Sequence, residues 1–227
     1  MSENLNGNLS VRAFVSTSKM DWTASPSGTV RRKRVHRVGP LEAGQVTSVV
    51  RYEKNATFPG HEHPDGEEIL VLDGVFSDEH GDWPAGSYLL NPEGVSHAPY
   101  SQTGCTLFVK LRQYPGAQRQ HLALNTHEMP WVTESRVGTN RKLLYSQDAF
   151  EDATELQQWP RGLSLVEQEY PKGVEIYVIK GNFEDEYGKY IAGDWLRLPK
   201  AFCHSPNSES GCLLYIKHGG FKYLATS

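Results

Sequence analysis

The sequence His61-Glu-His-Pro-Asp-Gly-Glu67, followed later by Pro92-Glu-Gly-Val-Ser-His97, decides how this chain is interpreted. Two histidines separated by one residue lie on the same side of an extended strand, because successive side chains alternate between its two faces. The imidazoles of His61 and His63 can therefore converge on one ion.

Two further side chains complete a candidate set of ligands. Pro64-Asp-Gly66 interrupts the strand, so a local turn must set the approach of Glu67, whereas His97 would come from another strand. Imidazole and carboxylate ligands together suit a borderline divalent metal, with iron or zinc expected first and nickel or manganese as alternatives. The sequence therefore predicts a mononuclear site of three histidines and one glutamate: His61, His63, Glu67 and His97.

The spacing of these residues resembles the two motifs of the cupin superfamily. The first motif is matched at His61, His63, Glu67 and Gly74, with Asn55 where the motif begins with glycine. The second motif is matched at Gly86, Pro92, Gly94 and His97, with Ser101 in place of its final asparagine. Neither departure affects a predicted metal ligand.

Within that superfamily the chain looks like the ChrR-type cupin domain, over residues 66–81, 84–87 and 104–113. In the namesake, this domain follows a zinc-binding anti-sigma domain with a His-x-x-x-Cys-x-x-Cys site. The three cysteines here, Cys105, Cys203 and Cys212, do not have that spacing. The resemblance therefore implies the cupin domain without the part that would bind a sigma factor, so a sigma factor is not expected as a partner.

An internal repeat organises the whole chain. Residues 64–113 align with residues 171–220 at a constant offset of 107, without a gap. The repeated positions include turn glycines and prolines, for example Gly74 and Gly181, or Pro92 and Pro199. The repeat predicts two similar domains, residues 1–115 and residues 116–227.

Each half contains short runs of β-branched, aromatic or alternating residues separated by turn signals. Strands are expected within residues 47–57, 67–72, 75–78, 87–90 and 107–112. Residues 147–159 are the one plausible short helix. This pattern predicts an all-β protein, and the cupin resemblance implies two tandem cupin domains, each a double-stranded β-helix of the jelly-roll type.

The predicted metal site is not repeated in the second half. At the offset of 107, His61 becomes Gln168, His63 becomes Tyr170 and Glu67 becomes Val174. Only His97 is retained, as His204. We therefore expect a degenerate C-terminal cupin domain without most metal ligands, which either supports the fold or binds an organic ligand in its cavity.

Composition restricts the classes of partner. The formal net charge of −4 gives no electrostatic reason to expect a nucleic acid or an anionic membrane surface. The polar N-terminus and the absence of a long apolar run argue against a signal peptide or a membrane span. Three scattered cysteines favour a reducing, cytoplasmic location. The sequence leaves open whether the chain forms a homodimer.

Two functions follow from the resemblance. Related cupins include dioxygenases that cleave diketones and hydroxylated aromatic ketones, which implies a metal-dependent enzyme with a small-molecule substrate. ChrR-type proteins instead imply a regulator related to anti-sigma factors, which would sense oxidative stress through the metal cupin. The sequence assigns no catalytic residue and no organic cofactor, and it does not decide between an enzyme and a sensor.

Overall fold

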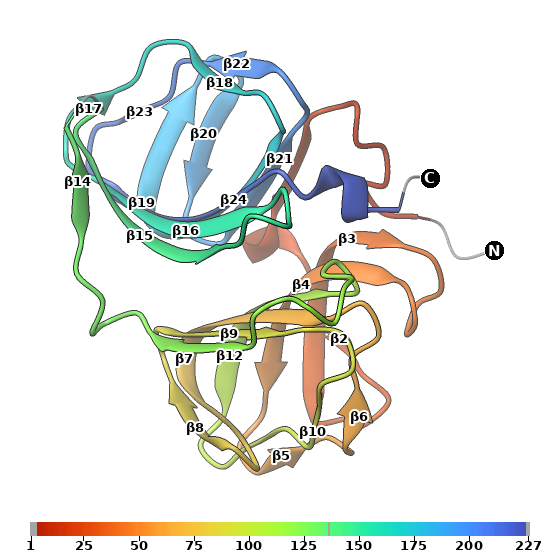
Figure 1. The fold of residues 1–227 in the computed structure, drawn as a ribbon. Helices are drawn as coiled ribbons and strands as arrows, with labels where there is room; N and C mark the ends of the chain where they lie inside the picture. Colours follow the sequence, from red (N-terminus) through yellow and green to blue (C-terminus); the bar gives the residue numbers. More distant parts are fainter. Residues whose placement is uncertain (1–3, 136, 226–227) are drawn as a thin grey trace. The chain divides into compact units, whose positions relative to one another are not determined.

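The structure is a computed structural model that describes residues 4–135 and 137–225. It divides into two compact units, each formed around a curved antiparallel sheet (Figure 1). The first contains the described residues among 1–7, 20–128 and 223–227, and the second contains residues 8–19 and 129–222. Within the described residues, no helix is long and apolar enough to cross a membrane.

Among its described residues, the first unit contains twelve strands. They are β2 (Thr23–Ala24), β3 (Val30–Val38), β4 (Gln45–Tyr52), β5 (Ala56–Thr57), β6 (His61–Glu62), β7 (Glu67–Asp78), β8 (Gly81–Pro84), β9 (Ser87–Asn91), β10 (Ser96–His97), β11 (Tyr100–Ser101), β12 (Cys105–Leu111) and β13 (Leu122–Asn125). The main sheet has the order β13-β9-β7-β12-β4-β3-β2, and the long strand β7 also pairs with β8 and β11.

The second unit repeats this plan. Its elements are β1 (Ala13–Ser16), the short 3-10 helix η1 (Thr17–Lys19), β14 (Val132–Glu134), β15 (Thr139–Ser146), β16 (Ala153–Trp159), β17 (Leu163–Ser164), β18 (Gln168–Tyr170), β19 (Val174–Asp185), β20 (Gly188–Ile191), β21 (Asp194–Leu198), β22 (Phe202–His204), β23 (Asn207–Ser208) and β24 (Cys212–His218). A second 3-10 helix, η2, spans Phe221–Tyr223. The main sheet has the order β1-β21-β19-β24-β16-β15-β14.

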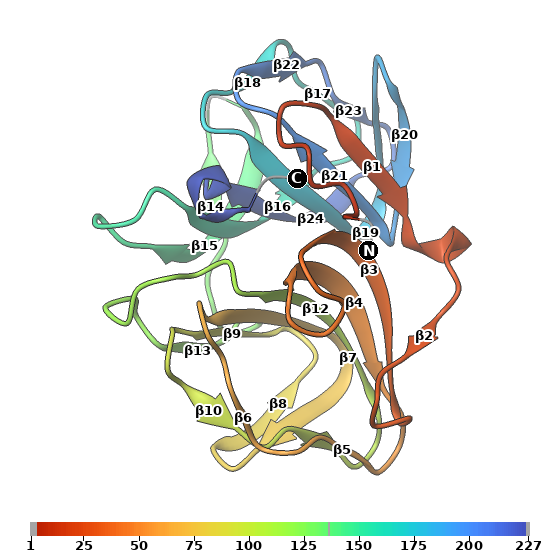
Figure 2. The same cartoon turned by 90° about the vertical axis from the view of Figure 1, so that its right-hand side faces the viewer.

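The first strand of each sequence half lies in the sheet of the other unit. β1 pairs with β21, as Figure 2 shows, and β13 pairs with β9. The two strands occupy equivalent edge positions next to β21 and β9. The predicted boundary between residues 115 and 116 separates the two copies of the sequence repeat. Because the first strand of each copy pairs within the other sheet, the compact units are discontinuous in sequence.

Each unit buries an apolar core inside its strands. In the first unit this core includes Ile69, Val71, Phe76, Leu107 and Val109, and in the second it includes Ile176, Val178, Phe183, Leu214 and Ile216. In β12 and β24, and in the first parts of β7 and β19, these side chains come from alternate positions, as strand geometry requires. Phe76 and Phe183 lie beyond the register shifts in β7 and β19, where the alternation changes. The all-β jelly-roll prediction is confirmed.

The helix predicted for residues 147–159 is wrong. Residues 153–159 form β16, which is hydrogen-bonded to β15 on one side and to β24 on the other. Glu155, Leu156 and Gln157 favour a helix by intrinsic propensity. Pairing along both edges of the strand satisfies its backbone groups and overrides that preference.

Candidate metal centre

A short antiparallel pair of strands brings two of the predicted ligands together. β6 pairs with β10 in a register that places His97 directly opposite His61. The ring centroids of His61 and His97 are 5.6 Å apart, and His63 completes a triangle at 4.7 Å from His61 and 4.8 Å from His97. One nitrogen from each ring lies within 4.8 Å of the others.

A tight turn brings Glu67 to the same point. Asp65 and Gly66 both have positive φ, 55° and 72°, and the Gly66 amide donates to the His63 carbonyl over 3.1 Å. A Cβ at Gly66 would lie only 2.8 Å from the Cβ of Tyr114, so glycine is required there for space as well as for conformation. The turn starts β7 with Glu67 facing the histidines.

The carboxylate of Glu67 lies within reach of two imidazoles. Its Oε2 is 3.3 Å from His63 Nε2 and 3.5 Å from His97 Nε2. Asn91 Nδ2 donates a hydrogen bond of 3.1 Å to the same oxygen, which fixes the orientation of the carboxylate. All four residues predicted as ligands are therefore brought together, while metal binding itself stays a prediction.

Hydrogen bonds at the outer ring nitrogens hold two of the histidines. His61 Nδ1 lies 2.9 Å from the Pro59 carbonyl oxygen, and His97 Nδ1 lies 3.2 Å from Asp78 Oδ2. With Nδ1 donating in each ring, the Nε2 lone pair is left for a metal, as is common for histidine ligands. His63 Nε2 is buried without a hydrogen-bond partner among the described residues.

Burial and charge perturb the protonation of these groups. Burial, together with the neighbouring His97 and His61, lowers the pKa of His63 to about 3. Burial also raises the pKa of Glu67 above its ordinary value, although His97 and Asn91 oppose this shift. Burial acts to lower the pKa of His97, but the hydrogen bond that His97 donates to Asp78 and the charge of Glu67 outweigh it and raise that pKa.

The pKa shifts of His63 and Glu67 reflect the cost of burying these groups without a cation beside them. A buried neutral imidazole without a partner, beside a buried carboxylate, is satisfied when a divalent cation binds between them. Three imidazole nitrogens and one carboxylate oxygen are also the donor types that borderline divalent metals prefer. The residues present therefore fit a divalent metal ion.

Two cavities reach these donor atoms. The outer one has a volume of about 270 Å³ and is lined by His61, His63, Phe58, Arg32 and Arg112, among others. The inner one, of about 60 Å³, reaches Glu67 and His97 between mostly apolar walls. A small molecule can therefore approach the candidate metal position from the outer cavity.

The second unit shows the same local geometry without the ligands. β18 pairs with β22 so that Gln168 lies opposite His204, in the register of His61 and His97. His204 Nδ1 lies 2.8 Å from Asp185 Oδ2, and His204 Nε2 lies 3.1 Å from the hydroxyl of Tyr170. A tyrosine hydroxyl thus occupies the bonding direction that a metal would take at His97.

Sequence reasoning missed two residues of the centre. One is Asp78, which orients His97; its recurrence as Asp185 at the repeat offset could have identified it from the sequence. Arg32 belongs to the basic run at residues 31–37, which has the composition of a solvated strand face. In the structure Arg32 lines both cavities, is bound to Glu42 Oε2 at 2.6 Å and lies over the ring of Phe58.

Solved structures with similar folds are distant in sequence. A candidate dioxygenase from Nostoc punctiforme is 15% identical, with a TM-score of 0.74 over 98% of this chain and 86% of its own. The bacterial pirin YhhW from Escherichia coli, in complex with nickel(II), is 17% identical, with a TM-score of 0.69 over 92% and 99%. An oxalate decarboxylase variant from Bacillus subtilis is 13% identical, with a TM-score of 0.64 over 94% and 78%.

No curated protein shows significant sequence similarity to the chain. The model of the ChrR cupin-like domain, in contrast, matches it twice, over residues 10–115 and 119–222. The two matches cover nearly the whole sequence and coincide with the internal repeat. The chain is therefore a tandem member of the ChrR cupin-like domain family.

Proposed function

We propose that the first unit binds one divalent metal ion through His61, His63, Glu67 and His97 and acts as a dioxygenase on a small diketone or aromatic ketone. The observation that carries this proposal is the cavity of about 270 Å³ that opens onto the donor atoms of His61 and His63. A purely structural metal site would be closed by protein ligands, whereas a reactive site needs an approach for substrate.

The comparisons support this choice of chemistry. One structural neighbour is a candidate dioxygenase, and another was solved with nickel(II). Iron or zinc is the metal we expect here, with nickel or manganese as alternatives. A bound redox-active metal would supply the position where substrate oxygens are chelated and dioxygen is activated.

The chain's own residues would position the substrate. Arg32 is held by Glu42 and presents a guanidinium to both cavities, where it can bind the anionic oxygen of an enolate. The apolar side chains of Ile69, Leu107 and Val109 in the inner cavity limit the access of water. Asp78 keeps His97 in the orientation that the metal requires.

Elemental analysis of protein purified without added metal tests the metal site, beside a His61→Ala variant. We expect about one divalent ion per chain in the wild type and much less in the variant.

Protein loaded with iron without oxygen should then consume O₂ with a diketone such as acetylacetone. Arg32→Gln should raise KM more than it lowers kcat, because Arg32 binds substrate and does not hold the metal. A wild type that binds no metal after loading would overturn the proposal.

The family supports a second candidate, a sensor of oxidative stress. The ChrR-type resemblance associates this cupin domain with regulation, and the same buried donors could release or change their metal on oxidation. Peroxide treatment separates the two functions. A sensor loses metal or changes conformation at stoichiometric peroxide and shows no turnover, whereas the dioxygenase turns over substrate repeatedly.

A further inference from the structure

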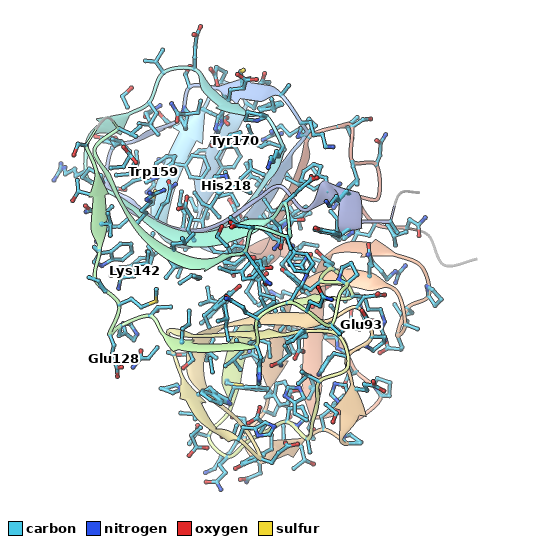
Figure 3. All side chains as sticks on the ribbon, viewed as in Figure 1. Glu93, Glu128, Lys142, Trp159, Tyr170 and His218 are labelled. Carbon is cyan, nitrogen blue, oxygen red and sulfur yellow. The ribbon has the colours of Figure 1, made fainter. Side chains whose placement is uncertain are left out.

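The second unit has a cavity where the first unit has its metal site. Its volume is about 390 Å³, and its lining includes Gln157, Leu165 and Gln168. Trp159, Tyr170 and His218, which are labelled in Figure 3, also line it. At the repeat offset, several of these replace residues that line the cavities of the first unit: Gln157 replaces Val50 and His218 replaces Leu111. The wall has thus gained polar groups, while the positions of the candidate metal ligands have lost all but one of those ligands.

A buried carboxylate fixes His218 at this cavity. Glu155 Oε1 lies 2.9 Å from His218 Nε2 and also accepts a hydrogen bond of 2.6 Å from Gln157. Burial acts to raise the pKa of Glu155, but the hydrogen bonds that it accepts from His218 and Gln157 oppose this, and the pKa is lowered from its ordinary value, so the carboxylate is ionised at neutral pH. In the tautomer that donates from Nε2 to Glu155, Nδ1 of His218 is an acceptor, and it has no partner among the described residues.

Tyr170 presents a second acceptor. Asp185 accepts from His204 Nδ1, so the neutral ring of His204 accepts the hydroxyl hydrogen of Tyr170 at Nε2. Burial, with the charges of Asp185 and Glu155, raises the pKa of Tyr170, which keeps its phenol protonated. The lone pairs of the phenol oxygen remain to accept a hydrogen bond from a ligand.

The remaining walls suit a flat ring. Trp159 is held in place by a hydrogen bond of 2.8 Å from its Nε1 to Gln157 Oε1, and Leu165 and Ile216 add apolar surface. The rings of Tyr170 and His218 lie 6.4 Å apart between their centroids. Glu169 and Lys172, which also line the cavity, carry opposite charges, so the lining does not favour an ionic ligand.

We propose that the second unit carries a metal-independent binding site for a small, uncharged aromatic compound with a hydroxyl group. The ring packs between the aromatic and aliphatic walls, and its hydroxyl donates to His218 Nδ1 or to the Tyr170 oxygen. This site does not depend on the metal proposed for the first unit.

Calorimetric titration of the metal-free full chain tests this proposal, with 2-naphthol as the probe. 2-Methoxynaphthalene is the matched ligand without a donor. We expect 2-naphthol to bind with a Kd below about 1 mM and the ether to bind about tenfold more weakly, since an acceptor in the cavity stays unpaired with it. At least one of two variants should weaken 2-naphthol binding about fivefold or more, because the single hydroxyl hydrogen bonds to one acceptor. The variants are His218→Leu, which introduces the residue found at Leu111 of the first unit, and Tyr170→Phe.

Two controls make the result decisive. Binding of the ether should be unchanged in His218→Leu and Tyr170→Phe, which shows that both variants keep the cavity. Binding of 2-naphthol should be unchanged in His61→Ala, because that residue belongs to the other unit. The proposal is overturned if 2-naphthol does not bind at about 1 mM, if the ether binds equally well, if neither variant weakens binding, or if His61→Ala abolishes it.

Discussion

The two units have the same strand order and the same carboxylate–histidine pair, yet they differ at the positions that decide chemistry. His97 is held by Asp78 over 3.2 Å, and His204 is held by Asp185 over 2.8 Å. The first histidine faces two imidazoles and a carboxylate, whereas the second faces the hydroxyl of Tyr170. The orienting pair is therefore part of the common framework, and the residues around it determine whether a metal can bind.

The same comparison distinguishes residues that the fold requires in both units from cavity-lining residues that differ between them. Turn glycines such as Gly74 and Gly181 recur with nearly the same positive φ, 73° and 76°, and each has so little space that a Cβ would lie close to a backbone carbonyl. Such positions are fixed by the fold in both units. Leu111 and His218 occupy equivalent strand ends, but one side chain is apolar and the other polar. The fold therefore does not dictate the residue at this position, and it can differ with the ligand that each cavity binds.

The largest expected effect comes from changing the residue at one equivalent position in each unit in turn. His63→Ala should reduce bound metal from about one ion per chain to almost none, because it leaves an incomplete donor set. Tyr170→Phe, at the equivalent position of the second unit, should leave the metal content unchanged. Elemental analysis of both purified variants checks this, and equal metal loss in both would break the contrast between the units.

Restoring the ligands of the second unit sharpens the comparison. The triple variant Gln168→His, Tyr170→His, Val174→Glu should bind about two divalent ions per chain, since His204 and Asp185 are already in place. Without metal this variant should have a lower thermal midpoint than the wild type, because it buries a carboxylate at a fully buried position. Added metal should recover part of that loss by binding only the folded state. A stoichiometry that stays at one would show that the frameworks are not equivalent.

The orienting carboxylates should have unequal importance for metal binding. Asp78→Asn should weaken metal affinity about 10- to 100-fold, because His97 loses the acceptor that fixes its ring and raises its basicity. Asp185→Asn should leave metal affinity unchanged. Competition with a chelator of known affinity measures both constants. Equal affinities in wild type and Asp78→Asn would remove Asp78 from the metal centre.

The smallest expected effect concerns the pH dependence of stability in the second unit. The lowered pKa of Glu155 contributes stability that is present above its unfolded value of about 4.5 and is lost as the pH falls through the folded pKa. In His218→Leu the carboxylate keeps its burial and loses its largest opposing partner, so its pKa should rise instead.

The free energy of unfolding of His218→Leu should therefore be about 1–2 kcal/mol lower than that of the wild type at pH 7. The difference should shrink as the pH falls from the raised folded pKa of Glu155 in the variant through its lowered folded pKa in the wild type, because the unfolded-state pKa is the same in both proteins. Urea denaturation at several pH values gives the two curves. A difference that does not change with pH would mean that the effect comes from packing and not from the hydrogen bond between His218 and the Glu155 carboxylate.

The sequence by itself determined the fold class and the duplication, and it named the four candidate ligands that the structure brings together. Motif spacing and repeat offset suffice for these, because alternating side chains on strands and glycine turns leave little freedom in where His61, His63 and Glu67 can lie. The same offset identified the loss of the site in the second half. Local pattern failed for residues 147–159, where pairing with β15 and β24 outweighed helix propensity.

Only the tertiary structure decided which residues surround the two sites and which strand completes each sheet. Arg32, on β3, lines the cavities at the candidate metal centre. Glu155 contacts His218 from the neighbouring strand, although the two residues are 63 positions apart in the sequence. The exchange of β1 and β13 likewise depends on edge pairing across more than 30 residues in one case and nearly the whole chain in the other. Local sequence carries no record of such long-range pairings, because the same short strand could satisfy its backbone at either edge.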